Sequence, residues 1–295
     1  MSGSQTVEVE GRTLTVTNLD RVLWPATGFS KGGMIDYYRA IGPVLVPHVV
    51  GRPVMLGRFP AGVEGRAWGQ LACRGRPDWM ATTELTLRTG VVRDVCLVND
   101  VASLMWVANQ GVIELHPFLA RAETFNRPTA MDFDLDPGPP AGLAECARVA
   151  LALRRVLEAE GRDAVVKTSG SAGLHAVIPL NGAATYGDTK GYARAAAARL
   201  AAEQPDLVLD RMTRSLRAGK VFVDWAQNDE RKQTVAAYSL RATAVPGVST
   251  PVTWDEVEHV ARTGDASALV FSPRDVLERV ERLGDVFRGV SATPS

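Results

Sequence analysis

The amino-acid sequence predicts an α+β fold (mixed α/β), in which short strands alternate with helices. Segments with alternating apolar and polar residues recur between glycine and proline turns, a pattern typical of strands. Residues 142–160 instead carry Leu143, Val149, Leu153 and Val156 on one helical stripe. Because strands and helices alternate only loosely and many links look like hairpins, we expect a mixed fold.

The first half of the chain is predicted to contain two hairpins, one helix and one buried strand. Residues 7–16 alternate in polarity around a glycine, which predicts a β-hairpin. A helix is expected over residues 30–41, because its first residue is a serine suited to N-capping. The apolar residues 53–59 predict a buried strand, and residues 84–98, with a turn at Gly90, predict a second hairpin.

The second half is predicted to contain strands at 164–168, 174–180 and 221–225, and helices at 142–160, at 190–202 and from Ser272-Pro273 onward. Thr253 and Glu256 have capping-box spacing. A Pro-Gly-Pro-Pro run at 137–140 separates a strand from a helix and is a candidate module junction. We expect a single catalytic domain over residues 1–295, with a short C-terminal tail at 284–295.

Composition and charge restrict the class of protein. The 33 basic residues balance the 33 acidic ones, which argues mildly against a nucleic-acid-binding protein, although a local basic patch would suffice. Cys73, Cys96 and Cys146 are an odd number without short spacing, which predicts neither a zinc cluster nor a disulfide framework. The N-terminus shows no signal pattern, and the apolar stretch at 44–50 is too short for a bilayer. We therefore expect a soluble cytoplasmic protein without a membrane partner.

The most unusual segment is Met131-Asp-Phe-Asp-Leu-Asp-Pro137. Alternate side chains of a strand share a face, so Asp132, Asp134 and Asp136 are expected to point one way while the residues between them enter the core. Such neighbours lie roughly 6–7 Å apart, and carboxylates this close repel one another unless a cation compensates. Hard divalent ions with oxygen ligands fit that need. The alternative is a solvated edge strand with capping acids.

A glycine-rich turn, Ser169-Gly-Ser-Ala-Gly-Leu-His175, lies between two of the predicted strands. Two glycines within five residues allow backbone N–H groups to converge on an anion, and the serine and histidine at its ends add side-chain donors. The alternative is a plain turn with a hydrogen-bonded histidine.

A third segment, residues 221–228, places Asp224 in an otherwise apolar strand, where a charge is costly unless it is paired or bound to a metal. Basic residues flank it on both sides: Arg211, Arg214, Arg217, Lys220, Arg231, Lys232 and Arg241. By themselves these also fit a solvated face. Together, the three segments suit nucleotidyl transfer, which needs acids to hold divalent metals and donors to neutralise a triphosphate.

At these three segments the sequence resembles the archaeo-eukaryotic primase superfamily, specifically the polymerase domain of bacterial ligase D and its stand-alone relatives. The family pattern is Phe-Asp-Leu-Asp-Pro, then Ser-Gly-x-x-Gly-Leu-His, then Val-Phe-Val-Asp with an amide pair, and all three occur here in that order. Flanking segments match as well: Asn18 to Trp24, Thr27-Gly-Phe-Ser-Lys31, Gly51-Arg-Pro-Val54, Glu114-Leu-His-Pro117 and Tyr238-Ser-Leu-Arg241. The resemblance covers about residues 12–262.

The resemblance implies a primase-polymerase catalytic core of two packed modules, one of them similar to an RNA-recognition-motif sheet. It implies that the catalytic residues Asp134, Asp136 and Asp224 ligate two ions, Mn²⁺ or Mg²⁺. The residues implied to contact the incoming nucleoside triphosphate are His116, Ser169, His175, Arg217, Gln227 and Arg241. The residues implied to contact DNA are Asn18, Arg21 and Lys31, at a downstream 5′-phosphate, and Trp68, stacked on the template.

By the same resemblance, the chain would be a metal-dependent DNA-directed nucleotidyltransferase that adds nucleotides, preferably ribonucleotides, to DNA primer ends in gap filling or end-joining repair. Its implied substrates are a primer-template or gapped DNA with a 5′-phosphate. Since no ligase or nuclease segment follows, a Ku-type end-binding protein and a separate DNA ligase are its implied partners. Its implied location is the cytoplasm, at the nucleoid.

Four positions depart from the family pattern. Ala172 and Gly57 stand where lysines are common, and Ala67 precedes Trp68 where a second aromatic residue is frequent. Asp132 is an extra acid where an apolar residue is usual. These departures bear on nucleotide affinity and template grip more than on the chemistry.

Two other classes of protein are alternatives. The first is a catalytically weak nucleic-acid-binding module, which the missing lysine at Ala172 favours. The second is an Asp-x-Asp phosphatase similar to haloacid dehalogenases. Those enzymes follow the second acid with Gly-Thr or Gly-Val, whereas Asp136 is followed by Pro137.

Overall fold

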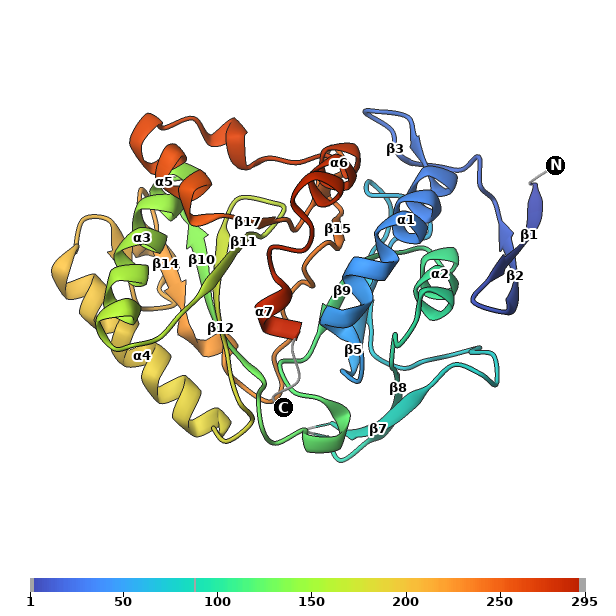
Figure 1. The fold of residues 1–295 in the computed structure, drawn as a ribbon, viewed down its shortest axis with the longest axis horizontal. Coiled ribbons are helices and arrows are strands. Elements are labelled where there is room, and N and C mark those ends of the chain that lie inside the picture. The colour runs from blue at the N-terminus through green and yellow to red at the C-terminus, as the bar shows by residue number, and fades with distance from the viewer. Residues whose placement is uncertain (1–2, 88, 292–295) are drawn as a thin grey trace.

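The computed structural model describes residues 3–87 and 89–291, which pack around two hydrophobic cores (Figure 1). One core lies within residues 3–117, here called the N-terminal module. The other lies within residues 130–225 and 251–269, here called the sheet module. Apolar residues from 236 to 248 and from 276 to 287 return to the first core, so the chain ties the two modules together. The predicted α+β class is confirmed.

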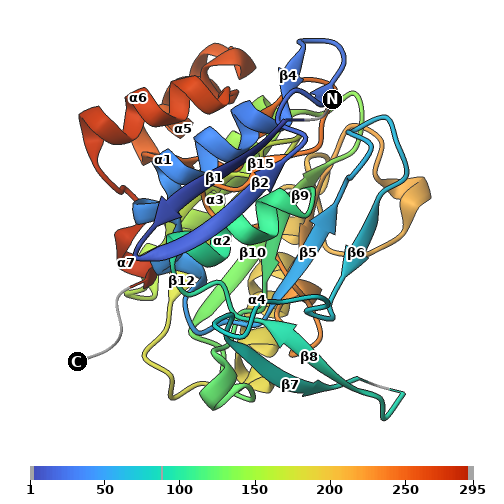
Figure 2. The same cartoon turned by 90° about the vertical axis from the view of Figure 1, so that its right-hand side faces the viewer.

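The N-terminal module contains β1 (Ser4–Val9), β2 (Arg12–Thr17), β3 (Val22–Trp24), β4 (Phe29–Ser30), α1 (Lys31–Val49), β5 (Val54–Arg58), β6 (Trp68–Gln70), β7 (Thr82–Thr86), β8 (Val92–Cys96), α2 (Val101–Asn109) and β9 (Val112–Pro117). The predicted hairpins are β1–β2 and β7–β8, and residue 88, in the turn of the second, lies outside the described residues. Strands β6, β5 and β9 form a sheet in that order. Figure 2 shows the β1–β2 hairpin in front of α2, which it contacts.

Helix α1 begins where the sequence predicts but ends later. The Ser30 hydroxyl accepts a hydrogen bond from the Gly33 N–H at 3.2 Å, which confirms the N-cap. The helix then continues to Val49 through two internal prolines, past the predicted end at residue 41. Its apolar stripe remains fully buried at Met34, Ile41, Leu45 and Val49, each 0% exposed. Burial of this stripe therefore outweighs the backbone hydrogen bonds that the prolines remove.

The sheet module contains β10 (Ala130–Pro137), α3 (Leu143–Ala159), β11 (Val165–Thr168), β12 (Leu174–Pro179), α4 (Tyr186–Glu203), β13 (Val208–Leu209), β14 (Val221–Asp224), β17 (Pro251–Val252) and α5 (Trp254–Thr263). Its six strands are ordered β13-β14-β10-β12-β11-β17. Figure 1 shows α3, α4 and α5 on one side of this sheet, with the N-terminal module on the other. The second face of the sheet is therefore turned toward the N-terminal module.

The remaining elements are β15 (Leu240–Arg241), β16 (Gly247–Val248), α6 (Pro273–Leu283), α7 (Arg288–Ser291) and the short 3₁₀ helices Ala122–Thr124, Arg214–Leu216, Trp225–Gln227 and Ala266–Leu269. The capping box predicted at Thr253 is confirmed, and Ser272 caps α6 as expected. None of the helices among the described residues is long and apolar enough to cross a membrane.

Part of the segment that we expected to be a tail packs against the N-terminal module. Asp285 accepts hydrogen bonds from the Tyr238 hydroxyl at 2.7 Å and from His48 Nε2 at 3.0 Å. Phe287 is only 4% exposed. The last four residues of the predicted tail, 292–295, lie outside the described residues. That residues 1–295 form a single domain stays a prediction.

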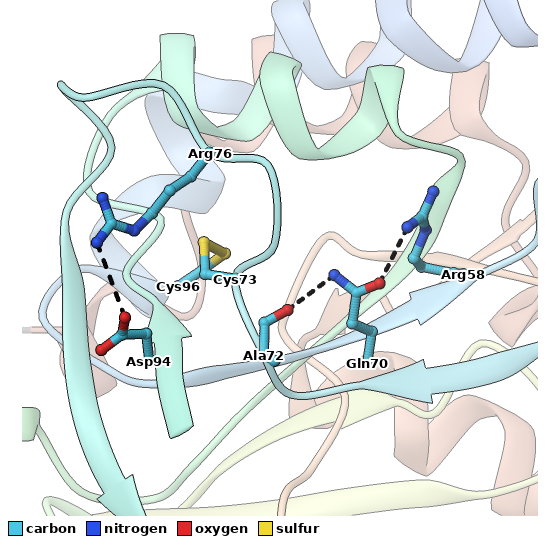
Figure 3. The surroundings of a disulfide bond; sticks show 7 residues. All are labelled: Arg58, Gln70, Ala72, Cys73, Arg76, Asp94 and Cys96. Atoms are coloured by element: carbon cyan, nitrogen blue, oxygen red, sulfur yellow. Dashed lines mark hydrogen bonds and ion pairs between the residues drawn. A yellow bond between two sulfur atoms is a disulfide. The ribbon is translucent and has the colours of Figure 1, made fainter. Parts of the chain in front are cut away.

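The expectation that the cysteines form no disulfide framework is wrong for two of them. Cys73 and Cys96 form a disulfide with their Cα atoms 5.0 Å apart, while Cys146 is free and buried (Figure 3). The bond forms because the loop after β6 lies along β8: the Cys73 N–H donates to the Asp94 carbonyl at 2.7 Å. These cysteines are 23 residues apart, and only the folded chain brings them together.

Candidate active site

Four polar side chains form one row across the six-stranded sheet. In the antiparallel register, Asp134 of β10 lies directly opposite Asp224 of β14 on one side and opposite His175 of β12 on the other. Lys167 of β11 is opposite His175 in turn. Directly opposed residues share a face and have Cβ atoms about 4.5–5.5 Å apart. The sheet therefore brings together three segments that are far apart in the sequence.

The two other acids of β10 share this face. Phe133 and Leu135 are 0% exposed and belong to the core beneath the helices, so Asp132, Asp134 and Asp136 face the N-terminal module, as predicted. Their exposure differs along the strand. Asp132 is 0% exposed, whereas the side chains of Asp134 and Asp136 are 13% and 47% exposed. Only the second and third acids reach an open pocket.

These carboxylates lie close together and are half-buried, and both conditions disfavour their ionised forms. Burial, together with the neighbouring charges of Asp136 and Asp132, raises the pKa of Asp134 to about 6 against the opposing effect of His175. Burial also raises the pKa of Asp224. Three carboxylates match the oxygen ligands that Mn²⁺ and Mg²⁺ prefer. Among residues 3–87 and 89–291, however, no three His, Cys, Asp or Glu side chains are already clustered for a metal, so the acids share a face without closing around one point.

A pocket of about 330 Å³ opens above these acids. Its lining includes Asp134, Asp136 and all the residues expected to bind nucleotide: His116, Ser169, His175, Arg217, Gln227 and Arg241. Two of its polar atoms, Arg217 Nε and Gln227 Oε1, are buried and have no hydrogen-bond partner among the described residues. Buried polar groups are rarely left unpaired, so these atoms point to a polar ligand.

The glycine turn between β11 and β12 forms one wall of this pocket. The Ser169 hydroxyl oxygen accepts hydrogen bonds from the N–H groups of Ser171 and Gly173, which closes the turn. Gly170 has a positive φ of 70°, and a Cβ on Gly173 would lie 2.4 Å from the Leu135 carbonyl oxygen. Glycine is therefore required at both positions, for backbone conformation and for close packing on β10. Ala172, the position where the family resemblance led us to expect lysine, also lines the pocket.

Arg217 approaches the acids from the loop before β14. Its guanidinium carbon lies 4.4 Å from the centroid of the Phe222 ring, and its Nη1 lies 4.0 Å from Asp136 Oδ2. Stacking on the ring restricts a long side chain that would otherwise be mobile. Arg211, Arg214 and Lys220 of the same basic cluster do not line the pocket.

Glu114 is a site residue that sequence reasoning did not single out. Its carboxylate accepts hydrogen bonds from His116 Nε2 and the Ala242 N–H, each at 2.9 Å, and lies 3.1 Å from Arg241 Nε. Burial alone would raise the pKa of Glu114, but the hydrogen bond from His116 and the charge of Arg241 lower it to about 2. Glu114 thus joins two nucleotide-site residues from different strands. Its position two residues before His116 in a strand was the available signal.

The residues expected to bind a 5′-phosphate lie in the N-terminal module, away from this pocket. Lys31 is 5% exposed, and its Nζ donates to the Thr17 carbonyl and to Asn109 Oδ1, both at 2.7 Å. Its backbone N–H donates to the Arg21 carbonyl at 2.8 Å, so the two basic residues are neighbours. Burial and the Arg21 charge lower the pKa of Lys31 to about 8. Asn18 precedes them with a positive φ of 56°.

Trp68 lies at the start of β6, on another surface of the N-terminal module. Its side chain is 40% exposed, and the Arg58 guanidinium lies 5.5 Å from its ring centroid. Arg58 is opposite Trp68 on β5 and donates a hydrogen bond to Gln70 (Figure 3). It also donates to the Gln110 carbonyl. Gly57, next to it, approaches Glu114 so closely that a Cβ would lie 2.9 Å from the Glu114 Cβ.

This combination of an antiparallel acid pair, an anion-binding turn and a second module over the sheet defines the primase-polymerase class of nucleotidyltransferases. The model of the LigD primase-polymerase domain family matches residues 30–287, and the chain belongs to this family.

Individual relatives agree with this assignment. The chain is 38% identical over 289 residues to the multifunctional non-homologous end joining protein LigD of Mycobacterium bovis, covering 95% of this chain and 37% of that protein. It is 26% identical over 276 residues to the bifunctional LigD protein of Bacillus subtilis, covering 93% of this chain and 43% of that one. The chain thus spans less than half the length of these relatives.

A solved structure is also similar over nearly its whole length. The polymerase domain from Mycobacterium tuberculosis ligase D, in complex with DNA, matches with a TM-score of 0.87 and 36% identity, covering 94% of this chain and 98% of that one. The similarity includes both modules, since it extends over almost all of each chain.

Proposed function

We propose that this chain is a metal-dependent, DNA-directed nucleotidyltransferase that extends DNA primer ends during gap filling in non-homologous end joining. The observation that carries the proposal is the pairing of Asp134 with Asp224 across the sheet, where Asp134 and Asp136 line a pocket in which Arg217 Nε and Gln227 Oε1 are buried and unpaired. Family membership and the similarity to a DNA-bound polymerase domain support it.

In this proposal Asp134, Asp136 and Asp224 hold two divalent ions, Mn²⁺ or Mg²⁺. Such ions would neutralise charge on the triphosphate and activate the attacking hydroxyl. The chain's own donors bind and orient the nucleotide: the phosphates contact Ser169, His175, Arg217 and Arg241, with His116 and Gln227 completing the pocket. Because Glu114 holds His116 and Arg241, part of this donor set is already in place before the nucleotide binds.

The finer aspects of the proposal concern the substrates. Asn18, Arg21 and Lys31 grip the 5′-phosphate on the downstream side of a gap, and Trp68 stacks on the template. Ribonucleotides are the preferred substrates, with Mn²⁺ as the preferred ion. A Ku-type end-binding protein and a separate DNA ligase are the partners, and the protein acts at the nucleoid.

The direct test is extension of a labelled primer on gapped DNA with Mn²⁺, with Mg²⁺ or with a chelator. We expect one or a few template-directed additions that require the metal, and faster addition of ribonucleotides than of deoxyribonucleotides. DNA binding without any extension would instead support the nucleic-acid-binding module. Phosphate release from a phosphomonoester without extension would support the phosphatase.

The 5′-phosphate should tighten binding of gapped DNA. Lys31 Nζ donates two of its three hydrogens, to the Thr17 carbonyl and to Asn109 Oδ1. The third hydrogen lies beside the Arg21 charge and is available to bind an anion. Charge-assisted hydrogen bonds contribute roughly 1.5–3 kcal/mol, so the phosphate should improve the Kd by about tenfold or more. Fluorescence titration of phosphorylated and unphosphorylated gapped DNA measures this difference.

Variants of the exposed arginine give the cleanest control for this experiment. Arg21→Ala should remove most of the preference for the phosphorylated DNA, and the Arg21→Ala/Lys31→Ala double variant should erase it. Arg39→Ala removes the same charge from an exposed position on α1 and should preserve the preference. Equal binding of the two DNAs by the unmodified protein would contradict the assignment.

Nucleotide affinity should be weak because Ala172 replaces the lysine of the glycine turn. A lysine there would add a point charge on a phosphate oxygen, worth about 1–2 kcal/mol after screening, or about 5- to 30-fold in affinity. We expect Ala172→Lys to lower the nucleotide KM while kcat changes much less, the signature of uniform binding. Steady-state kinetics on one primer-template measures both constants.

The control for this prediction adds the same charge elsewhere. Ala198→Lys places a lysine on the exposed face of α4 and should leave KM unchanged. If Arg214 or another basic residue already fills the role of the missing lysine, Ala172→Lys would leave KM unchanged or raise it through crowding of like charges.

A further inference from the structure

A buried carboxylate lies directly behind His175. Both carboxylate oxygens of Asp132 are within hydrogen-bond distance of His175 Nδ1, at 3.1 and 3.0 Å. The opposite ring nitrogen, Nε2, lies 3.7 Å from Asp134 Oδ1. The imidazole therefore bridges two acids of the same strand, one fully buried and one at the floor of the nucleotide pocket.

Asp132 cannot reach the nucleotide itself. It is 0% exposed and borders a separate small cavity between the modules, of about 50 Å³, rather than the nucleotide pocket. Its backbone N–H and carbonyl are both held by the buried Asn228, at 2.9 and 2.7 Å. Apart from the effect of its charge on Asp134, its carboxylate can reach the nucleotide pocket only through His175.

The imidazole needs such a partner to keep one orientation. The torsion that turns a histidine ring is broad and roughly two-fold, so strand geometry alone does not decide which ring nitrogen faces the pocket. The other contact of Nδ1 among the described residues is the Thr234 hydroxyl, at the longer distance of 3.5 Å. Asp132 is therefore the partner that decides which nitrogen is presented.

Stabilisation of the fold does not explain why an acid occupies position 132. Burying a carboxylate is costly, and Lys167, buried on β11, is close enough for its charge to act on Asp132. Replacing such a buried pair by apolar residues of similar volume is often neutral or stabilising. If this position contributed only to packing, an apolar side chain would be at least as favourable as the acid.

We propose that Asp132 is a positioning residue, which accepts the Nδ1–H of His175 and thereby presents Nε2 to Asp134 and the nucleotide phosphates. Carboxylates that orient a histidine in this way are common behind metal and catalytic sites. Lys167 keeps the carboxylate compensated, and the Ser249 hydroxyl holds Lys167 in turn, at 3.0 Å. The catalytic consequence rests on the proposed nucleotidyltransferase function, whereas the orientation of the ring does not.

The first arm of the test measures ring orientation without any activity. In ¹⁵N-histidine-labelled protein free of metal and nucleotide, four histidines contribute signals, and His175→Gln identifies the one of interest. We expect the His175 proton to reside on Nδ1 and to be protected from exchange. That protection should persist in Asp132→Asn, which keeps an acceptor oxygen, and disappear in Asp132→Leu/Lys167→Met, which removes both charges at similar volume.

The second arm measures kinetics. The double variant should lose about tenfold in kcat/KM for the nucleotide, mainly through KM, as expected for loss of an orienting partner. Asp132→Asn should recover most of that loss. Ser249→Ala removes the hydrogen bonds of this hydroxyl to Lys167 and to the Thr168 carbonyl and should leave both constants within about threefold, since it does not touch His175.

The two arms separate the possible failures. A native protein that extends no primer contradicts the proposed function, and the NMR arm then decides the role of Asp132 alone. Unchanged protection of the His175 Nδ1 proton in the double variant overturns the positioning role, as does a loss of kcat/KM in Asp132→Asn equal to that of the double variant. Should the double variant not fold, an unprotected Nδ1 proton in the native protein overturns it too.

Discussion

Alanine in place of Asp134, Asp136 or Asp224 is expected to lower nucleotide addition by at least about a thousandfold, while DNA affinity changes only a few-fold. A metal ligand in a two-metal site contributes several kcal/mol to transition-state stabilisation, and about 4 kcal/mol corresponds to that factor. In the proposed function DNA is bound by basic residues of the N-terminal module, so DNA affinity should not follow the loss of activity. Single-turnover extension and fluorescence titration of the same DNA measure the two quantities.

Two controls distinguish this result from loss of structure. Asp163→Ala, which removes an exposed acid, should leave activity unchanged. Asp134→Asn should be at least as stable as the native protein at neutral pH, because a carboxyl group with a pKa raised to about 6 opposes folding once it is ionised. Survival of activity in Asp134→Ala, together with its loss in Asp132→Ala, would overturn the assignment of the acids.

Local patterns were sufficient to predict most of the elements. The β1–β2 hairpin and helix α3 follow from period-two and period-3.6 patterns that neighbouring residues impose on one another. Helix α1 shows where this fails. The sequence predicted its end at residue 41, but burial of the stripe that continues to Val49 keeps it helical past two internal prolines. Tertiary packing, which no local window contains, decided that boundary.

The candidate site likewise has one part that local patterns predict and another that depends on the folded chain. The shared face of Asp132, Asp134 and Asp136 follows from strand alternation alone. Which of them meets Asp224 depends on strand register, and the choice of Asp134 came from the resemblance rather than from periodicity. The partners of Glu114 could not be predicted, since Arg241 and Ala242 reach it from 127 and 128 residues away only in the folded chain.

The cysteines show the limit of spacing arguments. An odd number of cysteines without a short spacing indicated free thiols, and Cys146 is free. Cys73 and Cys96 instead depend on the loop after β6 running along β8, where Ala72 also forms a bridge to Val95. Arg76 and Asp94 add an ion pair at 3.9 Å beside the bond (Figure 3). Such an arrangement has no local signature in the sequence.

Reducing the Cys73–Cys96 disulfide is expected to lower the free energy of unfolding by about 3 kcal/mol, because a cross-link over a loop of this length restricts the unfolded chain by about that amount. The effect should appear as a lower urea midpoint with a somewhat steeper slope, since the unfolded chain without the cross-link exposes more surface. Urea titrations of the oxidised and reduced protein, followed by tryptophan fluorescence, measure the difference.

Cysteine variants test whether this bond is responsible. Cys73→Ala/Cys96→Ala should have a similarly lowered midpoint that no longer responds to reductant, whereas Cys146→Ala should keep the full response, because that thiol is free. Primer extension should fall far less than in the acid variants, since the bond lies in the N-terminal module and lines no part of the nucleotide pocket. Identical midpoints for the oxidised and reduced native protein would show that the disulfide does not restrict the unfolded chain in solution.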